Sequence, residues 1–282
     1  MSFINMYRTL TYFLIIFVTV VTACTPEYKL AKEFRETPRE LYFHVTPPAT
    51  VYKYNHKGEL VEDLNQLNQA EQDSALYYSS GFIQYINDSV FLENYVNGFL
   101  DELRSLKLDV FIGHEADSFL LSKAQSYEIT IAQVQLDEYF YPYEDQEYYY
   151  DTLFYKKFDL DAVDFSIWLE LSKLGGSGNS KAILYSTHMA SDNLEGEFVI
   201  DPFRQDVKYS YTVDSLKVED IPDIASFLGK VHASYLYDFF LNQYVAFHLP
   251  KGYQPQFYYH YNRFRNSFIP VEEERFELLD SY

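Results

Sequence analysis

The chain has 282 residues and a formal net charge of −20 at pH 7, because 42 acidic residues outnumber 22 basic ones. Phosphate backbones and anionic headgroups would repel such a chain, which argues against nucleic-acid binding and against charge-driven membrane docking. The single cysteine excludes intramolecular disulfides, so stability must come from a core that is rich in aromatic residues.

The first element is an apolar segment at residues 10–21, preceded by one charged residue, Arg8, and followed by the small residues Thr22 and Ala23. A short positive region, an apolar stretch and a small-residue cleavage site are the features of a secretory signal peptide. The apolar stretch is shorter than the roughly 20 residues that a transmembrane helix needs. We therefore predict a signal peptide over residues 1–23.

The block Val21-Thr22-Ala23-Cys24 resembles the lipobox of bacterial lipoproteins, in which one aliphatic and two small residues precede a cysteine. The resemblance implies that the signal is cut before Cys24 and that both this thiol and the new amino terminus are acylated. Two or three acyl chains give a stable membrane anchor, whereas one chain binds only marginally. An uncleaved membrane anchor with an incidental cysteine is the alternative.

Residues 24–40 are mostly polar and mixed in charge, so we expect a lipidated cysteine followed by a spacer. Lipoproteins of some Gram-negative groups that reach the cell surface carry an acidic cluster just after the cysteine. Here only Glu27 is acidic at that position. This favours anchoring in the outer membrane with the domain facing the periplasm, and surface exposure is the alternative.

Two short β-type runs, residues 41–45 and 50–54, follow the spacer. Residues 60–76 place leucines at a modest helical spacing. Residues 91–106 repeat their apolar positions at i, i+3 and i+4, which is the stripe of a helix packed on a core. A strand is expected directly after this helix, at residues 108–112.

Three long strands are predicted next. Residues 127–136 alternate between apolar and polar but change phase midway, which indicates a β-bulge or a strand buried on both faces. Residues 163–172 alternate cleanly, and residues 175–180 form a Gly/Ser-rich turn into an antiparallel partner at residues 182–189. Two further short strands are expected within residues 197–213.

A second long helix begins near Pro222, because the missing N–H of proline costs nothing in the first helical turn. Its apolar positions run from Ile224 to Phe240, and it ends before Pro250. Residues 250–282 are crowded with Tyr and Phe and form an aromatic-rich C-terminal extension.

This order of elements predicts an α+β domain over residues 41–249, in which helices cover one face of a mixed sheet with a long antiparallel meander.

The element order of residues 88–246 resembles that of small outer-membrane accessory lipoproteins. These are the auxiliary lipoproteins of ABC-type lipid transport systems and the lipoproteins that assist lipopolysaccharide assembly. The likeness rests on residues 91–112, 127–138, 163–174, 183–189 and 224–245.

Six tyrosines define a candidate binding surface. Tyr rings offer a large contact area at low entropic cost, and they stack on sugars or on a partner protein. The first group lies in the acidic segment 144–151, where an exposed hairpin loop is an equally good explanation and a calcium site a third one. The six residues are Tyr148, Tyr149, Tyr150, Tyr258, Tyr259 and Tyr261.

Other polar clusters have simpler explanations. His114, Glu115 and Asp117 lie together, but acidic residues are favourable in a first helical turn without any metal. Lys181 follows the Gly/Ser turn, but a phosphate loop needs its lysine at the start of a helix rather than of a strand. His232 lies near the apolar face of its helix, as a core histidine would. We therefore predict no catalytic residue, no metal and no cofactor.

The sequence thus predicts a non-enzymatic lipoprotein of the cell envelope, anchored through Cys24. It would act as an accessory or assembly subunit of an envelope or lipid-transport machine, with an envelope protein as its partner. A module that binds glycans or another envelope polymer through the tyrosines is the alternative. A hydrolase is a third hypothesis, which a cleft with convergent Asp, Glu and His would support.

Overall fold

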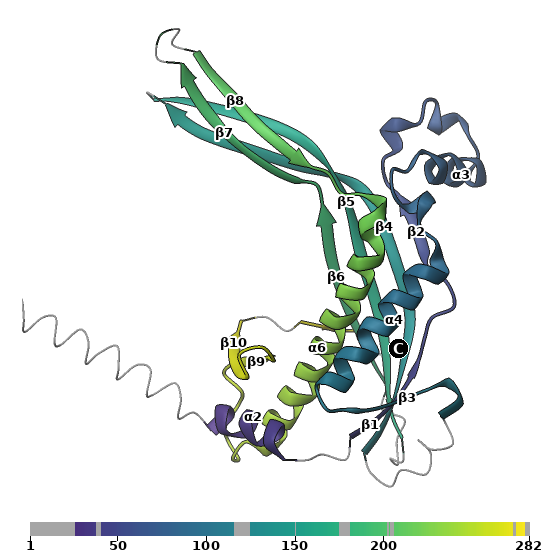
Figure 1. The fold of residues 1–282 in the computed structure, drawn as a ribbon, viewed down its shortest axis with the longest axis vertical. Coiled ribbons are helices and arrows are strands. Elements are labelled where there is room, and N and C mark those ends of the chain that lie inside the picture. The colour runs from purple at the N-terminus through teal and green to yellow at the C-terminus, as the bar shows by residue number, and fades with distance from the viewer. Residues whose placement is uncertain are drawn as a thin grey trace, which may run out of the picture.

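The computed structural model describes residues 26–37, 41–115, 125–149, 151–174, 181–201, 203, 206–272 and 275–279. The predicted signal peptide, Cys24, Tyr150 and the turn at residues 175–180 lie outside the described residues. The fold is α+β, as the sequence predicts, with helices packed on one face of a mixed sheet (Figure 1). None of the described helices is both long and apolar enough to cross a membrane.

The sheet has the strand order β11-β6-β5-β4-β1-β3, and β2 also pairs with β4. Strand β1 runs parallel to both β3 and β4, whereas β4, β5 and β6 form the predicted antiparallel meander. The bounds are β1 Leu41–Thr46, β2 Tyr52–Asn55, β3 Asp109–Ile112, β4 Gln125–Tyr149, β5 Thr152–Lys173, β6 Lys181–Ser191 and β11 Glu277–Leu279.

A β-bulge in β4 explains the change of hydrophobic phase in its sequence. The pairing of β4 with β5 shifts between Ile131 and Gln133, so Ala132 is the extra residue. Ile131 is buried before the bulge, and Val134 and Leu136 are buried after it. Because one extra residue inverts the alternation, both halves of the strand keep their apolar side chains on the core face.

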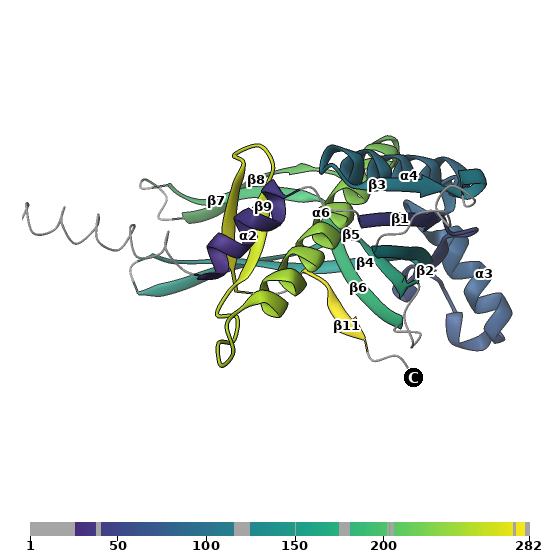
Figure 2. The same cartoon turned by 90° about the horizontal axis from the view of Figure 1, so that it is seen from below.

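The long helices α4 (Asp88–Ser105) and α6 (Ile221–His248) lie side by side on the sheet (Figure 2). They cross where Gly98 faces Gly229. A Cβ on Gly98 would lie 2.2 Å from the carbonyl oxygen of Ser226, and one on Gly229 would lie 2.1 Å from that of Tyr95. Only glycine lets the two backbones approach this closely.

A small lobe follows β2 and contains α3 (Gln69–Ser79) and three short 3-10 turns, η1 (Gly58–Leu60), η2 (Leu64–Gln66) and η3 (Ile83–Tyr85). Glu138 of β4, which is fully buried, holds this lobe in place. Its carboxylate accepts hydrogen bonds from Lys57 Nζ at 2.8 Å and from the N–H groups of Gly81, Phe82 and Ile83. Every oxygen of this buried charge is therefore satisfied, as burial of a carboxylate requires.

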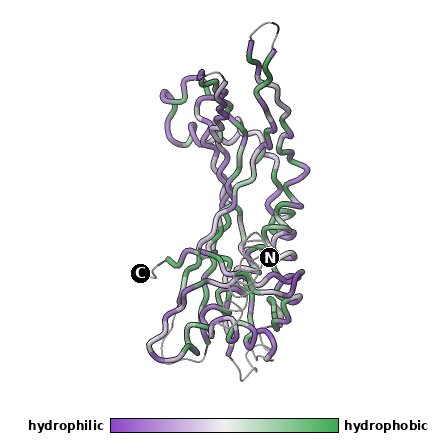
Figure 3. Tube along the Cα trace, turned by 90° about the vertical axis from the view of Figure 1, so that its left-hand side faces the viewer, coloured by the Kyte–Doolittle hydropathy of each residue, from purple (hydrophilic) through white to green (hydrophobic). Residues whose placement is uncertain are grey.

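The distal halves of β4 and β5 extend past the core as a projecting arm (Figure 1). A second hairpin, β7 (Asn193–Asp201) and β8 (Asp206–Asp214), packs against it. We define the arm as residues 141–160 and 193–214, which carry both hydrophobic and hydrophilic stretches (Figure 3). The Tyr-rich acidic segment is thus mostly strand, since β4 continues to Tyr149 and the turn contains Asp151 with φ of 63°.

Both ends of the described chain pack on α6. Helix α2 (Pro26–Glu36) lies in the segment that the sequence assigned to a spacer, and its Phe34 is buried against Tyr237. The hairpin β9 (Tyr258–Asn262) and β10 (Ser267–Val271) is joined to α6 by the buried Asp238, which accepts hydrogen bonds from the Tyr261 N–H and the His260 ring. The C-terminal extension is therefore part of the folded core, and β11 completes one sheet edge.

Candidate functional site

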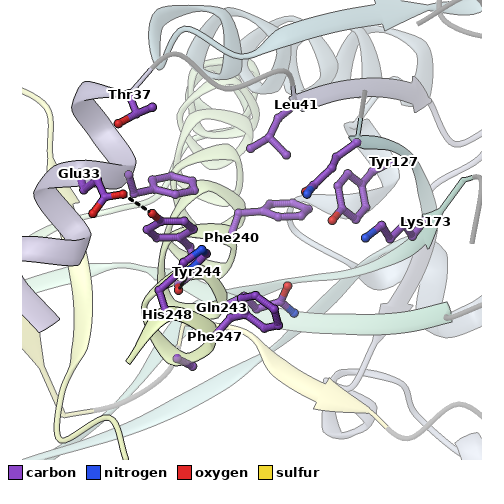
Figure 4. A pocket seen from close by; sticks show the side chains of 13 residues that line it. Glu33, Thr37, Leu41, Tyr127, Lys173, Phe240, Gln243, Tyr244, Phe247 and His248 are labelled. Carbon is purple, nitrogen blue, oxygen red and sulfur yellow. Dashed lines mark hydrogen bonds between the residues drawn. The ribbon is translucent and has the colours of Figure 1, made fainter. Parts of the chain in front are cut away.

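A cleft of about 1100 Å³ lies between α2, the C-terminal end of α6 and the adjoining ends of β1, β4 and β5 (Figure 4). Its floor is apolar. Phe34, Leu41 and Phe240 are buried there, and the Phe240 ring meets the Tyr127 ring edge to face at 4.8 Å. Such packing fixes the rings, so the floor presents a preformed apolar surface.

The rim of the cleft is polar and includes Lys173. The Nζ of Lys173 lies 5.9 Å from the centre of the Tyr127 ring and makes no ion pair with any residue that the structure describes. Glu33 lies across the cleft and accepts a 2.7 Å hydrogen bond from the Tyr244 hydroxyl. The rim therefore offers a positive charge beside an apolar floor.

The described lining residues of this cleft combine an apolar floor with the ammonium group of Lys173 and the carboxylate of Glu33. An acid–base mechanism needs a titratable pair within hydrogen-bond reach of a substrate. Among the described lining residues Glu33 is the one carboxylate, and the His248 ring is bonded to the Tyr244 carbonyl at 2.9 Å. An apolar chain on the floor and an anionic or polar group near Lys173 would satisfy the chemistry of the cleft.

The first group of candidate tyrosines does not form one surface. Tyr148 is 72% exposed near the tip of the arm. Tyr149 points to the opposite face, because successive side chains in a strand alternate, and its hydroxyl donates to the Phe198 carbonyl at 3.0 Å. Tyr150 lies outside the described residues.

The prediction of a tyrosine surface in the C-terminal extension was wrong for two of its three residues. Tyr259 and Tyr261 are each only 3% exposed, so their rings cannot stack on a ligand. The Tyr261 hydroxyl accepts a hydrogen bond from Arg35 Nε and donates to Asn266, which ties α2 to the tail. Tyr258 alternates with them and is half-buried.

Two residues that sequence reasoning missed share the exposed face of Tyr148. Leu153 pairs directly with Tyr148 across the hairpin, and Tyr155 pairs with Gln146, so their side chains point the same way. Both are exposed. We call Tyr148, Leu153 and Tyr155 the arm patch. The hairpin register would have revealed it, because opposite residues of an antiparallel pair face the same side.

The inner face of the arm is packed with aromatic rings. Phe158 and Phe198 both contact the Tyr209 ring, which also covers Gly196, where a Cβ would lie 2.2 Å from the Tyr209 hydroxyl. Loss of solvent around that hydroxyl, together with its 2.8 Å hydrogen bond to Asp145, raises the pKa of Tyr209 to about 12. The arm therefore has an internal packing layer of its own, which holds its two hairpins together.

Among the remaining candidates, Glu115 and His232 have structural contacts. No group of three or more His, Cys, Asp or Glu in the described part of the chain could hold a metal ion. Glu115 accepts a hydrogen bond from the Ile112 N–H, whereas Asp117 and the side chain of His114 lie outside the described residues. His232 is fully buried, and this burial lowers its pKa to about 3.

Comparison of the sequence with protein-family models gives no match, and a search of curated proteins gives no significant match. The cleft and the arm patch are therefore the features of this chain that bear on its function.

Proposed function

We propose that this protein is an envelope lipoprotein, acylated at Cys24, that acts as a non-catalytic accessory or assembly subunit of an envelope or lipid-transport machine. The arm patch is the observation that carries the proposal. Tyr148, Leu153 and Tyr155 are exposed on a projection that needs no partner for its own packing. Exposed apolar and aromatic groups of this kind mark surfaces for association.

The arm suits a docking role for an energetic reason. Association costs free energy when side chains and loops must be ordered at the interface. The two hairpins are already held together by rings and by the Tyr209–Asp145 hydrogen bond, so little ordering remains. Tyr side chains then supply contact area with few rotatable bonds.

The position of the arm fits anchoring at the other end of the molecule. Helix α2 begins at Pro26, one residue beyond the Thr25 that follows Cys24. Figure 1 shows α2 at the lower end and the arm at the upper end of the molecule. An acylated Cys24 in the outer membrane would thus leave the arm free to meet a partner in the periplasm.

The cleft supports a link to lipid transport. Its apolar floor and the Lys173 ammonium group match a molecule with an acyl chain and an anionic head.

A glycan-binding role is the second candidate function, because the exposed rings of Tyr148 and Tyr155 could stack on sugars.

Gentle detergent extraction of the tagged full-length protein, followed by mass spectrometry, tests the proposal. The double variant Tyr148→Ser/Tyr155→Ser should lose a near-stoichiometric envelope partner that the wild-type protein retains, because the patch loses both rings. The matched control is Tyr78→Ser/Tyr85→Ser, which removes two equally exposed tyrosines from the lobe around α3.

Equal partner recovery from both double variants would contradict docking through the arm patch. A wild-type protein that is recovered alone but binds a glycan array, with binding lost only in the Tyr148→Ser/Tyr155→Ser variant, would favour the glycan-binding role instead.

A further inference from the structure

The end of α6 and the segment after it expose three large aromatic side chains. Phe247 is 85% exposed, Tyr253 64% and Phe257 46%. We call these three residues the tether-side patch. Segment 249–257 carries a single charge, Lys251, in a protein whose net charge is −20. The patch therefore consists of exposed aromatic side chains, and the segment that carries two of them is nearly uncharged in a strongly acidic molecule.

The tether-side patch is fixed next to the start of α2. Glu27 is buried, and its carboxylate accepts a 2.6 Å hydrogen bond from the Gln256 N–H, which lies next to Phe257. At the other end of α2, Phe34 packs on Tyr244, one turn before Phe247. The patch and the first described helix therefore belong to one packed unit.

The length of chain before α2 limits how far this patch can lie from Cys24. Three residue steps separate Cys24 from Glu27, and an extended residue spans at most about 3.6 Å, so the reach is on the order of 10 Å. Acyl chains on Cys24 would thus hold Glu27 on the order of 10 Å from the anchored residue, and would hold the segment bonded to Glu27 close to the headgroup layer. This step rests on the acylation proposed above.

We propose that Phe247, Tyr253 and Phe257 insert into the headgroup layer of the leaflet that holds the Cys24 acyl chains. Tyr favours the boundary between water and hydrocarbon, because its ring can bury an apolar body there and keep the hydroxyl in water, and Phe supplies buried apolar area in segments that lie in this interface. The interaction is apolar rather than electrostatic, so the acidic net charge does not prevent it. Phe247 also lines the cleft, which places the mouth of the cleft beside the bilayer.

Fluorescence quenching in vesicles tests this contact with the full-length acylated protein. Trp168 is the only tryptophan, so a Trp168→Phe background allows one reporter at a time. In phosphatidylcholine vesicles with brominated acyl chains, Tyr253→Trp and Phe257→Trp should each lose fluorescence and shift their emission to the blue, at low and at high salt. Tyr78→Trp, an exposed site on the lobe around α3, should show neither change.

Trypsin provides a second measurement that needs no substitution in the patch. Lys251 lies between Phe247 and Tyr253, and the acylated wild-type protein in vesicles should be cleaved there more slowly than the Cys24→Ala protein beside the same vesicles. Equal cleavage rates, or unquenched reporters, would overturn the insertion.

Incorporation of labelled palmitate separates this inference from the proposed anchoring. Labelled wild-type protein and unlabelled Cys24→Ala are the expected results. Labelled protein whose Tyr253→Trp and Phe257→Trp reporters stay unquenched would overturn the insertion alone. Wild-type protein without label would overturn both the anchoring and the insertion.

Discussion

His232 is held between α4 and α6 with 1% of its surface exposed. Its Nδ1 lies 2.9 Å from the Tyr95 hydroxyl, and its Nε2 has no hydrogen-bond partner among the described residues. Burial lowers the pKa of His232 to about 3, so the folded protein keeps this ring neutral. Its contribution to stability is complete above the unfolded pKa of about 6.5 and is lost as the pH falls towards 3.

As the pH is lowered, the free energy of unfolding should therefore decrease more steeply for the wild-type protein than for His232→Gln. Below pH 6.5 His232 binds a proton in the unfolded chain but not in the folded chain. The free energy of unfolding therefore falls by about 1.4 kcal/mol for each pH unit below 6.5. Urea unfolding of both proteins at pH 7, 5.5 and 4.5 measures the difference, and other titrating groups cancel in the comparison. A difference in unfolding free energy that does not change with pH would contradict this assignment.

Contacts between distant residues were beyond the reach of sequence reasoning at this scale. Glu138 and its partner Lys57 are 81 residues apart, and neither lies in a recognisable motif. Tyr259 and Tyr261 were expected at the surface because Tyr rings can stack on sugars or on a partner protein. Only the hairpin with β10 and its contact with α6 decides which side of β9 is buried.

Helix α4 and helix α6 show what hydrophobic periodicity does and does not predict. Their apolar stripes located both helices, and the phase change in β4 indicated the bulge that the structure contains. The point where the two helices cross was not predictable. A glycine inside a helical pattern can mark a close contact between helices, but it can equally mark a weak helix. The close approach at Gly98 and Gly229 is visible only in three dimensions.

Gly98→Ala should destabilise the protein, although alanine normally stabilises a helix by about 1 kcal/mol relative to glycine. The new Cβ would lie 2.2 Å from the Ser226 carbonyl oxygen, so the helices must separate, at a cost of about 1–3 kcal/mol or more. Chemical denaturation measures the change. Asn97→Ala, at the exposed neighbouring position, is the control and should be neutral or slightly stabilising. An equal effect of both variants would show that the crossing tolerates the methyl group.

The arm differs from the long helices because its two hairpins come from separate parts of the chain. Alternation in the sequence located β7 and β8 as short strands, but it could not show that they cover the distal half of the β4–β5 hairpin. The Tyr-rich segment therefore resembled a loop, since its acidic residues and its rings occur on both faces of the strand, and the hairpin that covers it lies about fifty residues away in the sequence.

The whole molecule consists of a core and an arm whose packing is largely independent. The main hydrophobic cluster joins α2, α4, α6 and the sheet, and it does not include the buried arm residue Phe198. Local stability can differ between such units, because each is held by its own contacts. The folding of the core therefore need not depend on the arm.

Replacing residues 145–156 and 195–212 with short Asn-Gly turns should leave a folded core. Thermal unfolding followed by circular dichroism should stay cooperative, with a midpoint within a few degrees of the wild-type value because the main cluster is untouched. Shortening only one of the two hairpins is a harsher change, since it exposes the rings of the other. Loss of a cooperative transition in the doubly shortened protein would show that the arm belongs to the core.

The parallel pairing of β1 with β4 has a mechanical consequence if Cys24 is held in a bilayer. The covalent path from the anchor runs through α2 and enters the sheet at Leu41, which pairs with Gln125, the first residue of β4. A pull on the arm tip draws β4 away from the membrane while the anchor holds the start of β1. The force therefore loads the two strands in shear, along their length. The ladder from Leu41 to Thr46 then shares the force across all its hydrogen bonds, and these bonds do not break one at a time.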